Sequence, residues 1–129
     1  MNPIQGLRDF LTALNSQAVK ADAIATVTGL LAAAIPNFVD THAVAEALVN
    51  SRLAELHYEE RYGHFSAVLA DVETNAATDN RVMWLTSYEQ DVDRALNGLE
   101  LTRRRTQRLL QQVGQMVADA NKSTPADDT

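Results

Sequence analysis

A seven-residue repeat of apolar side chains between Arg81 and Asn121 constrains the fold of this chain more than any other feature. Such spacing places the repeated side chains along one face of an α-helix. The repeat consists of Leu85, Val92, Leu99, Val113 and Ala120, while Leu96, Leu110 and Val117 each fall four residues after a position of that series. Ala95, Leu109 and Met116 widen the stripe. A stripe of this width is typical of a helix packed in a bundle, not of a lone two-stranded coiled coil.

The length of this helix predicts an interface. An unbroken helix over about forty residues would extend roughly 60 Å, well beyond a compact body of this chain length. We therefore expect its apolar face to pack against other copies of the chain or against a partner protein. The expected interface residues are Leu85, Val92, Leu96, Leu99, Leu110, Val113 and Val117.

Gly98 decides whether the stretch forms one helix or two. A glycine inside a helix costs only about 0.8–1 kcal/mol relative to alanine, which favours an unbroken helix. A break at Asn97-Gly98 is the alternative, because the two halves could then fold back on each other.

The stripe is interrupted from Thr102 to Arg108, where no apolar side chain occurs. The interruption contains Arg103, Arg104, Arg105 and Arg108, for which we expect either a solvated helix face or ion pairs with an acidic partner; phosphate contact is the alternative. Residues 79–100 hold five acidic and two basic side chains, whereas residues 101–122 hold one acidic and five basic. Antiparallel packing of two such helices would set opposite charges against each other.

The rest of the chain predicts further helices and no strands, because Pro and Gly are rare and β-branched residues do not alternate with polar ones. Pro36 should end the second helix and Gly63 the third. The expected helices cover residues 3–15, 19–35, 41–62 and 64–73, before the long one, for which Asp79 or Asn80 is the expected cap. The predicted fold is all-α, a bundle of four to five helices with a long amphipathic C-terminal helix. It forms a single domain over residues 1–122, followed by a flexible acidic tail over 123–129.

Composition narrows the function classes. The chain has no cysteine, which excludes disulfides and thiolate chemistry. Its formal net charge of −6 argues against the class of proteins that wrap nucleic acid over their whole surface. The apolar run from Ala23 to Val39 is too short and too interrupted for a membrane span. With no secretory signal pattern at Met1, we expect a cytoplasmic protein, or a virion protein if the chain is viral.

No motif for catalysis or for a cofactor stands out. Cysteine nucleophiles, a Gly-x-Ser-x-Gly elbow and glycine-rich phosphate loops are all absent from the sequence, so no catalytic residue, cofactor or metal is predicted. His57, Glu60 and His64 could share a helical face, but their spacing matches no known helical metal site. Whether this group binds a metal is left open.

These features predict a non-enzymatic helical oligomerisation, adaptor or structural assembly protein. Small, acidic, cysteine-free helical chains are common among phage and bacterial assembly proteins, which makes a viral protein one expectation. The alternative is a packaging or architectural accessory protein, whose Arg103–Arg108 segment contacts nucleic acid on an oligomer.

Overall fold

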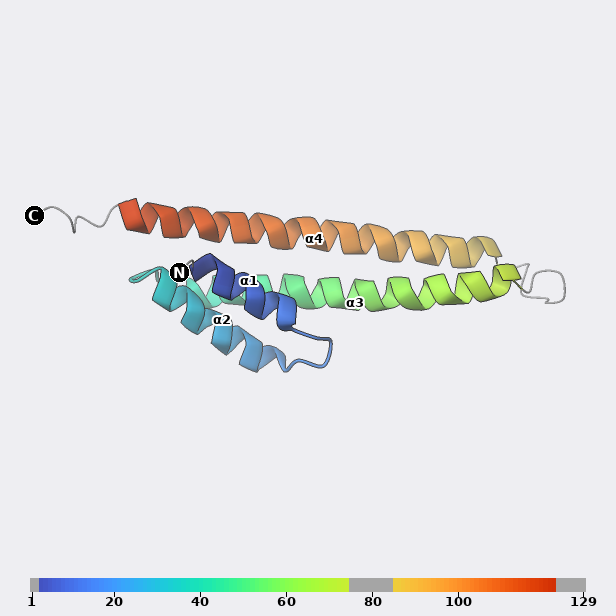
Figure 1. Cartoon of the computed structure of the whole chain (residues 1–129), viewed down its shortest axis with the longest axis horizontal. Helices are drawn as coiled ribbons and strands as arrows, with labels where there is room; N and C mark the ends of the chain where they lie inside the picture. Colours follow the sequence, from blue (N-terminus) through green and yellow to red (C-terminus); the bar gives the residue numbers. More distant parts are fainter. Residues whose placement is uncertain (1–2, 75–84, 123–129) are drawn as a thin grey trace, which may run out of the picture.

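The computed structural model describes residues 3–74 and 85–122, which form four helices (Figure 1). These are α1 (Pro3–Ala13), α2 (Lys20–Ala34), α3 (Thr41–Thr74) and α4 (Leu85–Lys122). No strand occurs in these two ranges. The all-helical prediction is therefore confirmed, and the long C-terminal helix is α4.

The longest two helices, α3 and α4, lie antiparallel and side by side, and the C-terminal end of α4 extends past the start of α3 (Figure 1). Helices α1 and α2 pack only over one half of this hairpin, where α3 begins and α4 ends (Figure 1). We call that half the body, and we call the uncovered half, residues 56–74 and 85–100, the arm. The main apolar core lies in the body and consists of Leu7, Leu11, Ala23, Ile24, Val27, Leu31, Ile35, Ala45, Leu48, Val49, Leu110, Val113 and Val117.

A repeat on α3 explains why the hairpin forms. Its residues are separated alternately by four and three positions, and all of them are buried or half-buried: Val44, Leu48, Ser51, Glu55, Tyr58, Tyr62, Phe65, Leu69 and Val72. Two helices with this spacing can pack along a common seam. The seam of α3 therefore matches the stripe of α4, and the stripe has a partner within the same chain.

Helix α4 continues through Asn97-Gly98, as the sequence favoured. The reason lies in the packing, because the ring of Tyr58 on α3 lies directly against the backbone at Gly98. A Cβ atom at position 98 would overlap that ring. Glycine here allows α3 and α4 to approach closely around a bulky side chain.

The predicted end of the third helix at Gly63 is wrong, because α3 runs unbroken from Thr41 to Thr74. Gly63 has no positive φ and no neighbouring atom within 4 Å of an added Cβ. Its small cost in helix propensity is outweighed by seam residues on both sides of it, Tyr62 and Phe65, which continue the repeat. The expected fourth helix over 64–73 is thus the C-terminal part of α3.

Other boundaries agree closely with the sequence analysis. Helix α1 ends at Ala13 and α2 at Ala34, two residues before Pro36. Asn37 has a φ of 71°, a left-handed conformation that asparagine tolerates, and the short turn lets α3 fold back on α2. The expected cap at Asp79 or Asn80, the start at Arg81 and the tail 123–129 lie outside the described residues.

No helix within 3–74 and 85–122 has the length and the apolar character that a bilayer span requires.

Candidate functional site

A layer of hydrogen-bonded hydroxyl groups separates the body from the arm. Ser51 Oγ lies 2.7 Å from Thr106 Oγ1, and Thr106 Oγ1 donates to Thr102 O at 3.0 Å. Thr102 Oγ1 lies 2.9 Å from Gly98 O and 3.0 Å from Leu99 O. Ser51, Thr102 and Thr106 are all buried. These two threonines occupy the seam where the apolar stripe of α4 is interrupted, so the interruption is filled from within the chain.

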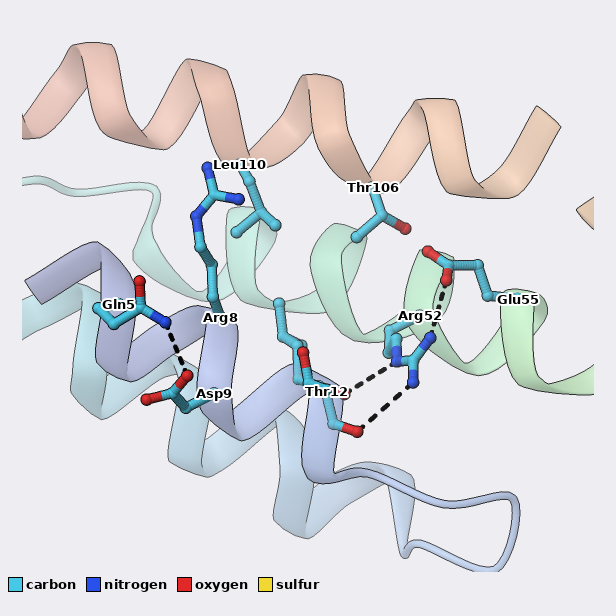
Figure 2. A pocket seen from close by; sticks show the side chains of 9 residues that line it. Gln5, Arg8, Asp9, Thr12, Arg52, Glu55, Thr106 and Leu110 are labelled. Carbon is cyan, nitrogen blue, oxygen red and sulfur yellow. Dashed lines mark hydrogen bonds and ion pairs between the residues drawn. The ribbon is translucent and has the colours of Figure 1, made fainter. Parts of the chain in front are cut away.

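Arg52 fastens the end of α1 to α3. Its Nε donates to Leu11 O at 2.9 Å, and its Nη2 donates to Thr12 O at 3.5 Å. The third interaction joins Nη1 to Glu55 Oε2 at 2.8 Å (Figure 2). The last carbonyl groups of a helix lack partners within the helix, so a guanidinium group that binds two of them caps α1.

This ion pair is largely sequestered from solvent. The side chains of Arg52 and Glu55 are 16% and 9% exposed, respectively. Charges that are removed from water need a partner of opposite charge. Here Arg52 and Glu55 are each other's partner. Across the described residues, no fully buried side-chain nitrogen or oxygen lacks a hydrogen-bond partner. The ion pair and the hydroxyl layer beside it therefore satisfy their buried polar atoms within the described residues.

A cavity of about 470 Å³ lies between α1, α3 and α4, beside this layer (Figure 2). Its charged lining consists of Arg8, Asp9, Arg52 and Glu55, two cations and two anions. Asp9 accepts a hydrogen bond from Gln5 at 2.8 Å, and Arg52 is engaged by Glu55. The lining is thus balanced in charge, which gives little preference for a charged ligand of either sign.

The serine in the layer is not arranged as a nucleophile. An activated serine needs a base within hydrogen-bond reach. Ser51 Oγ instead contacts the Thr106 hydroxyl and, at 3.4 Å, the Thr102 carbonyl oxygen. The geometry fits a role in aligning the two helices, because buried polar groups in a helical seam fix its register.

The seven residues predicted as an interface fall into two groups. Four are buried inside the chain: Leu99, Leu110, Val113 and Val117. The other three, Leu85, Val92 and Leu96, lie on the arm and are only half-buried. The structure thus places the first group in packing between helices of one chain and leaves the second group partly accessible. Contact with another chain remains a prediction for the arm.

All four arginines of the predicted polar segment, Arg103, Arg104, Arg105 and Arg108, are exposed. Arg103 Nη2 lies 3.8 Å from Glu59 Oε2 on α3, and both side chains are more than half exposed. An ion pair at such exposure contributes about 0–1 kcal/mol. The segment is therefore a solvated, positively charged surface on α4.

The three possible metal ligands on α3 face solvent. His57, Glu60 and His64 are each exposed, and because Gly63 does not break α3 they share one continuous helix. Within the described ranges, no set of three histidine, aspartate or glutamate side chains is placed to hold a metal ion.

Sequence reasoning missed the residues of the layer itself, although one signal was present. Thr106 falls seven residues after Leu99 and seven before Val113, so it continues the repeat as a polar member. Arg52 and Glu55 are three residues apart, a spacing that permits a pair on one helix. Their contact with the end of α1 has no counterpart in the local sequence.

Comparison of the chain with protein-family models, with curated proteins and with solved structures gave no significant match.

Proposed function

We propose that this chain is a non-enzymatic helical assembly module that associates with a second copy through its arm. The observation that supports the proposal is the uneven cover of the hairpin. In the body, α1 and α2 complete an apolar core around α3 and α4. Within residues 3–74 and 85–122, no third helix covers the seam of the arm, and Leu85, Val92 and Leu96 stay half-buried.

Charge supports a second copy as the occupant. The α3 part of the arm carries four acidic residues and one arginine, and the α4 part carries the same numbers. The adjoining α4 segment from Arg103 to Arg108 carries four exposed arginines. In an antiparallel pair of chains, the acidic arm of each copy lies against the basic segment of the other. Such charge complementarity favours this orientation over the parallel one.

Light scattering behind size exclusion tests the association on the full chain. The expected result at micromolar concentration is a mass of at least two copies, against 14.1 kDa for one chain. The mass should decrease in about 1 M salt, where the screening length shrinks to roughly 3 Å and the charge pairs between copies weaken. A single-copy mass at low salt and micromolar concentration would overturn the proposal.

A matched pair of variants locates the contact. Leu96→Glu places a carboxylate on the half-buried side of the arm, whereas Leu101→Glu places one on a side chain that is already 61% exposed. Association through the arm should weaken by about tenfold or more for Leu96→Glu, because an unpaired carboxylate resists burial. Leu101→Glu should change the association constant by no more than about twofold. Equal effects would place the contact elsewhere.

Exposure of the four arginines favours a second candidate, contact between α4 and nucleic-acid phosphate. Arg104, Arg105 and Arg108 lie on the surface beside Arg103. Binding to duplex DNA should then lose about 0.9 log units of affinity per log unit of salt for each phosphate neutralised. A mobility shift at low salt that disappears when Arg103, Arg104 and Arg105 become Gln would support this role. An unchanged shift, or none, would reject it.

A further inference from the structure

A second surface that no described residue covers lies on the body, between the start of α3 and the second half of α4. It is an open groove of about 410 Å³ with a mainly apolar lining. Small side chains, Ala43 and Ala47, line its α3 side, and Leu109 and Met116 line its α4 side. Val39, just before α3, is 89% exposed beside Phe38, which also lines the groove. Apolar surface of this kind commonly marks an interaction site.

Charges along α4 make this surface complementary to itself. Arg105, Gln112 and Asp119 are spaced by seven residues, so they follow one side of the helix, and Gln112 lines the groove. Arg105 and Asp119 are both exposed and carry opposite charges at equal distances from Gln112. Asp119 accepts a hydrogen bond from Gln115 at 2.9 Å.

We infer that this groove is a two-fold contact with a second copy of the chain, in which two α4 helices cross antiparallel near Gln112. The rotation then sets Arg105 of each copy against Asp119 of the other and brings the two Gln112 amides together. Ala43 of each copy then meets Ala47 of the other, where small side chains allow close approach of the α3 backbones. A two-fold contact uses the same patch on both copies, which is what this symmetric charge pattern supplies.

The contact goes beyond the proposed function, because it is a second self-contact that is separate from the arm. Because the crossing lies in the body, the two arms would project from opposite ends of the pair. The groove engages Arg105, so Arg103, Arg104 and Arg108 remain for the arm contact. Two different two-fold contacts on one chain build closed rings or open chains of copies. Wild-type protein should therefore exceed two copies as its concentration rises.

Two variants that reverse one charge each test the antiparallel orientation of the two α4 helices. Both are made in the Leu96→Glu background, which weakens the arm contact. In that background, Arg105→Asp opposes two acids across the interface, and Asp119→Arg opposes two arginines. Each variant alone should dimerise about tenfold more weakly than its background, since two favourable surface pairs become repulsive. Mixed one to one, the variants can form a heterodimer with both pairs restored, so the two-copy mass should return.

A second pair of variants tests the apolar part of the groove. Ala43→Glu adds a carboxylate at an exposed position within it, while Ala33→Glu adds one at an exposed position on α2. The first should weaken the pair by about tenfold or more and the second should not, with equal helical content by circular dichroism in both.

The outcomes separate this contact from the arm. A two-copy mass in the Leu96→Glu background that the charge variants remove and their mixture restores would support the groove, whether or not the arm associates. A single-copy background beside an assembling wild type would refute the groove contact and leave the arm contact standing. Charge variants that keep the two-copy mass would also refute it.

Discussion

At the scale of single residues, two leucines on α4 that are two positions apart occupy opposite environments. Leu99 is 3% exposed and packs in the seam, whereas Leu101 is 61% exposed. A step of two residues rotates the side chain by about 200° around the helix axis. The seven-residue repeat was sufficient to separate these positions, because Leu99 belongs to it and Leu101 does not.

We therefore expect Leu99→Asp to be far more damaging than Leu101→Asp. The first buries an unpaired carboxylate and removes a packed leucine, which should cost about 3 kcal/mol or more. The second leaves its charge in water, and its cost should stay below about 0.5 kcal/mol. Urea denaturation of the two variants beside wild type measures both values. Similar losses for the two would mean that the seam is assigned to the wrong face of α4.

Two glycines on α4 offer an equally direct comparison. Gly98→Ala would drive a methyl group into the Tyr58 ring, whereas a methyl group at Gly114 meets no atom within 4 Å. Replacing a helical glycine by alanine normally raises the free energy of unfolding by about 0.8–1 kcal/mol. Gly114→Ala should show most of that increase. Gly98→Ala should instead lower the free energy of unfolding, because Tyr58 must move. Equal gains in thermal and urea denaturation would contradict the close approach of α3 and α4 at Gly98.

At the scale of the elements, periodicity predicted the helices well and their ends less well. Pro36 stops α2 because proline cannot continue a helix, a local rule that needs no tertiary information. The sequence predicted a helix end at Gly63 and an unbroken helix at Gly98. Both glycines lie inside unbroken helices. Their effect depends on seam partners such as Tyr58 and Phe65, which one stretch of sequence does not reveal. The place of Thr102 and Thr106 in the seam was missed because only apolar residues were counted as seam members.

The attachment of α1 is the least predictable of these features, and it depends on one side chain. Arg52→Met removes the donors to Leu11 O and Thr12 O and leaves the Glu55 carboxylate buried without its cation. Breaking a buried pair in this way costs about 3–5 kcal/mol, so a large loss of stability is expected. Amide exchange should accelerate first in residues 7–13, at the end of α1.

The companion variant for this prediction removes both charges. Arg52→Met with Glu55→Met should recover much of the lost stability, because paired apolar replacement of a buried ion pair is often neutral. It should not fully restore slow exchange at the end of α1, whose carbonyl groups still lack the guanidinium donor. If Arg52→Met leaves both stability and α1 exchange unchanged, the side chain does not fasten α1.

At the scale of the whole molecule, the hydroxyl layer of Ser51, Thr102 and Thr106 divides a four-helix body from a two-helix arm. The body buries an apolar core shared by α1, α2, α3 and α4. The arm has buried residues as well, including Val72 and Ala95, but only two helices contribute to them. Fewer buried apolar contacts mean a lower free energy of local opening. The fold therefore combines a stable support with a less stable projection, and the projection carries the acidic charge.

Native-state hydrogen exchange in dilute denaturant should show this division directly. Amides in residues 56–74 and 85–100 should open at a lower free energy than those of the body, with the change occurring near the hydroxyl layer. If the arm is covered by another copy, its protection should also rise with protein concentration, because association stabilises the state that it binds. Protection in the α1 and α2 part of the body should respond less, since that core is complete within one chain.

Equal opening free energies along the whole hairpin would contradict the division. Arm protection independent of concentration, in a sample that light scattering shows to be associated, would contradict the arm as the surface of assembly.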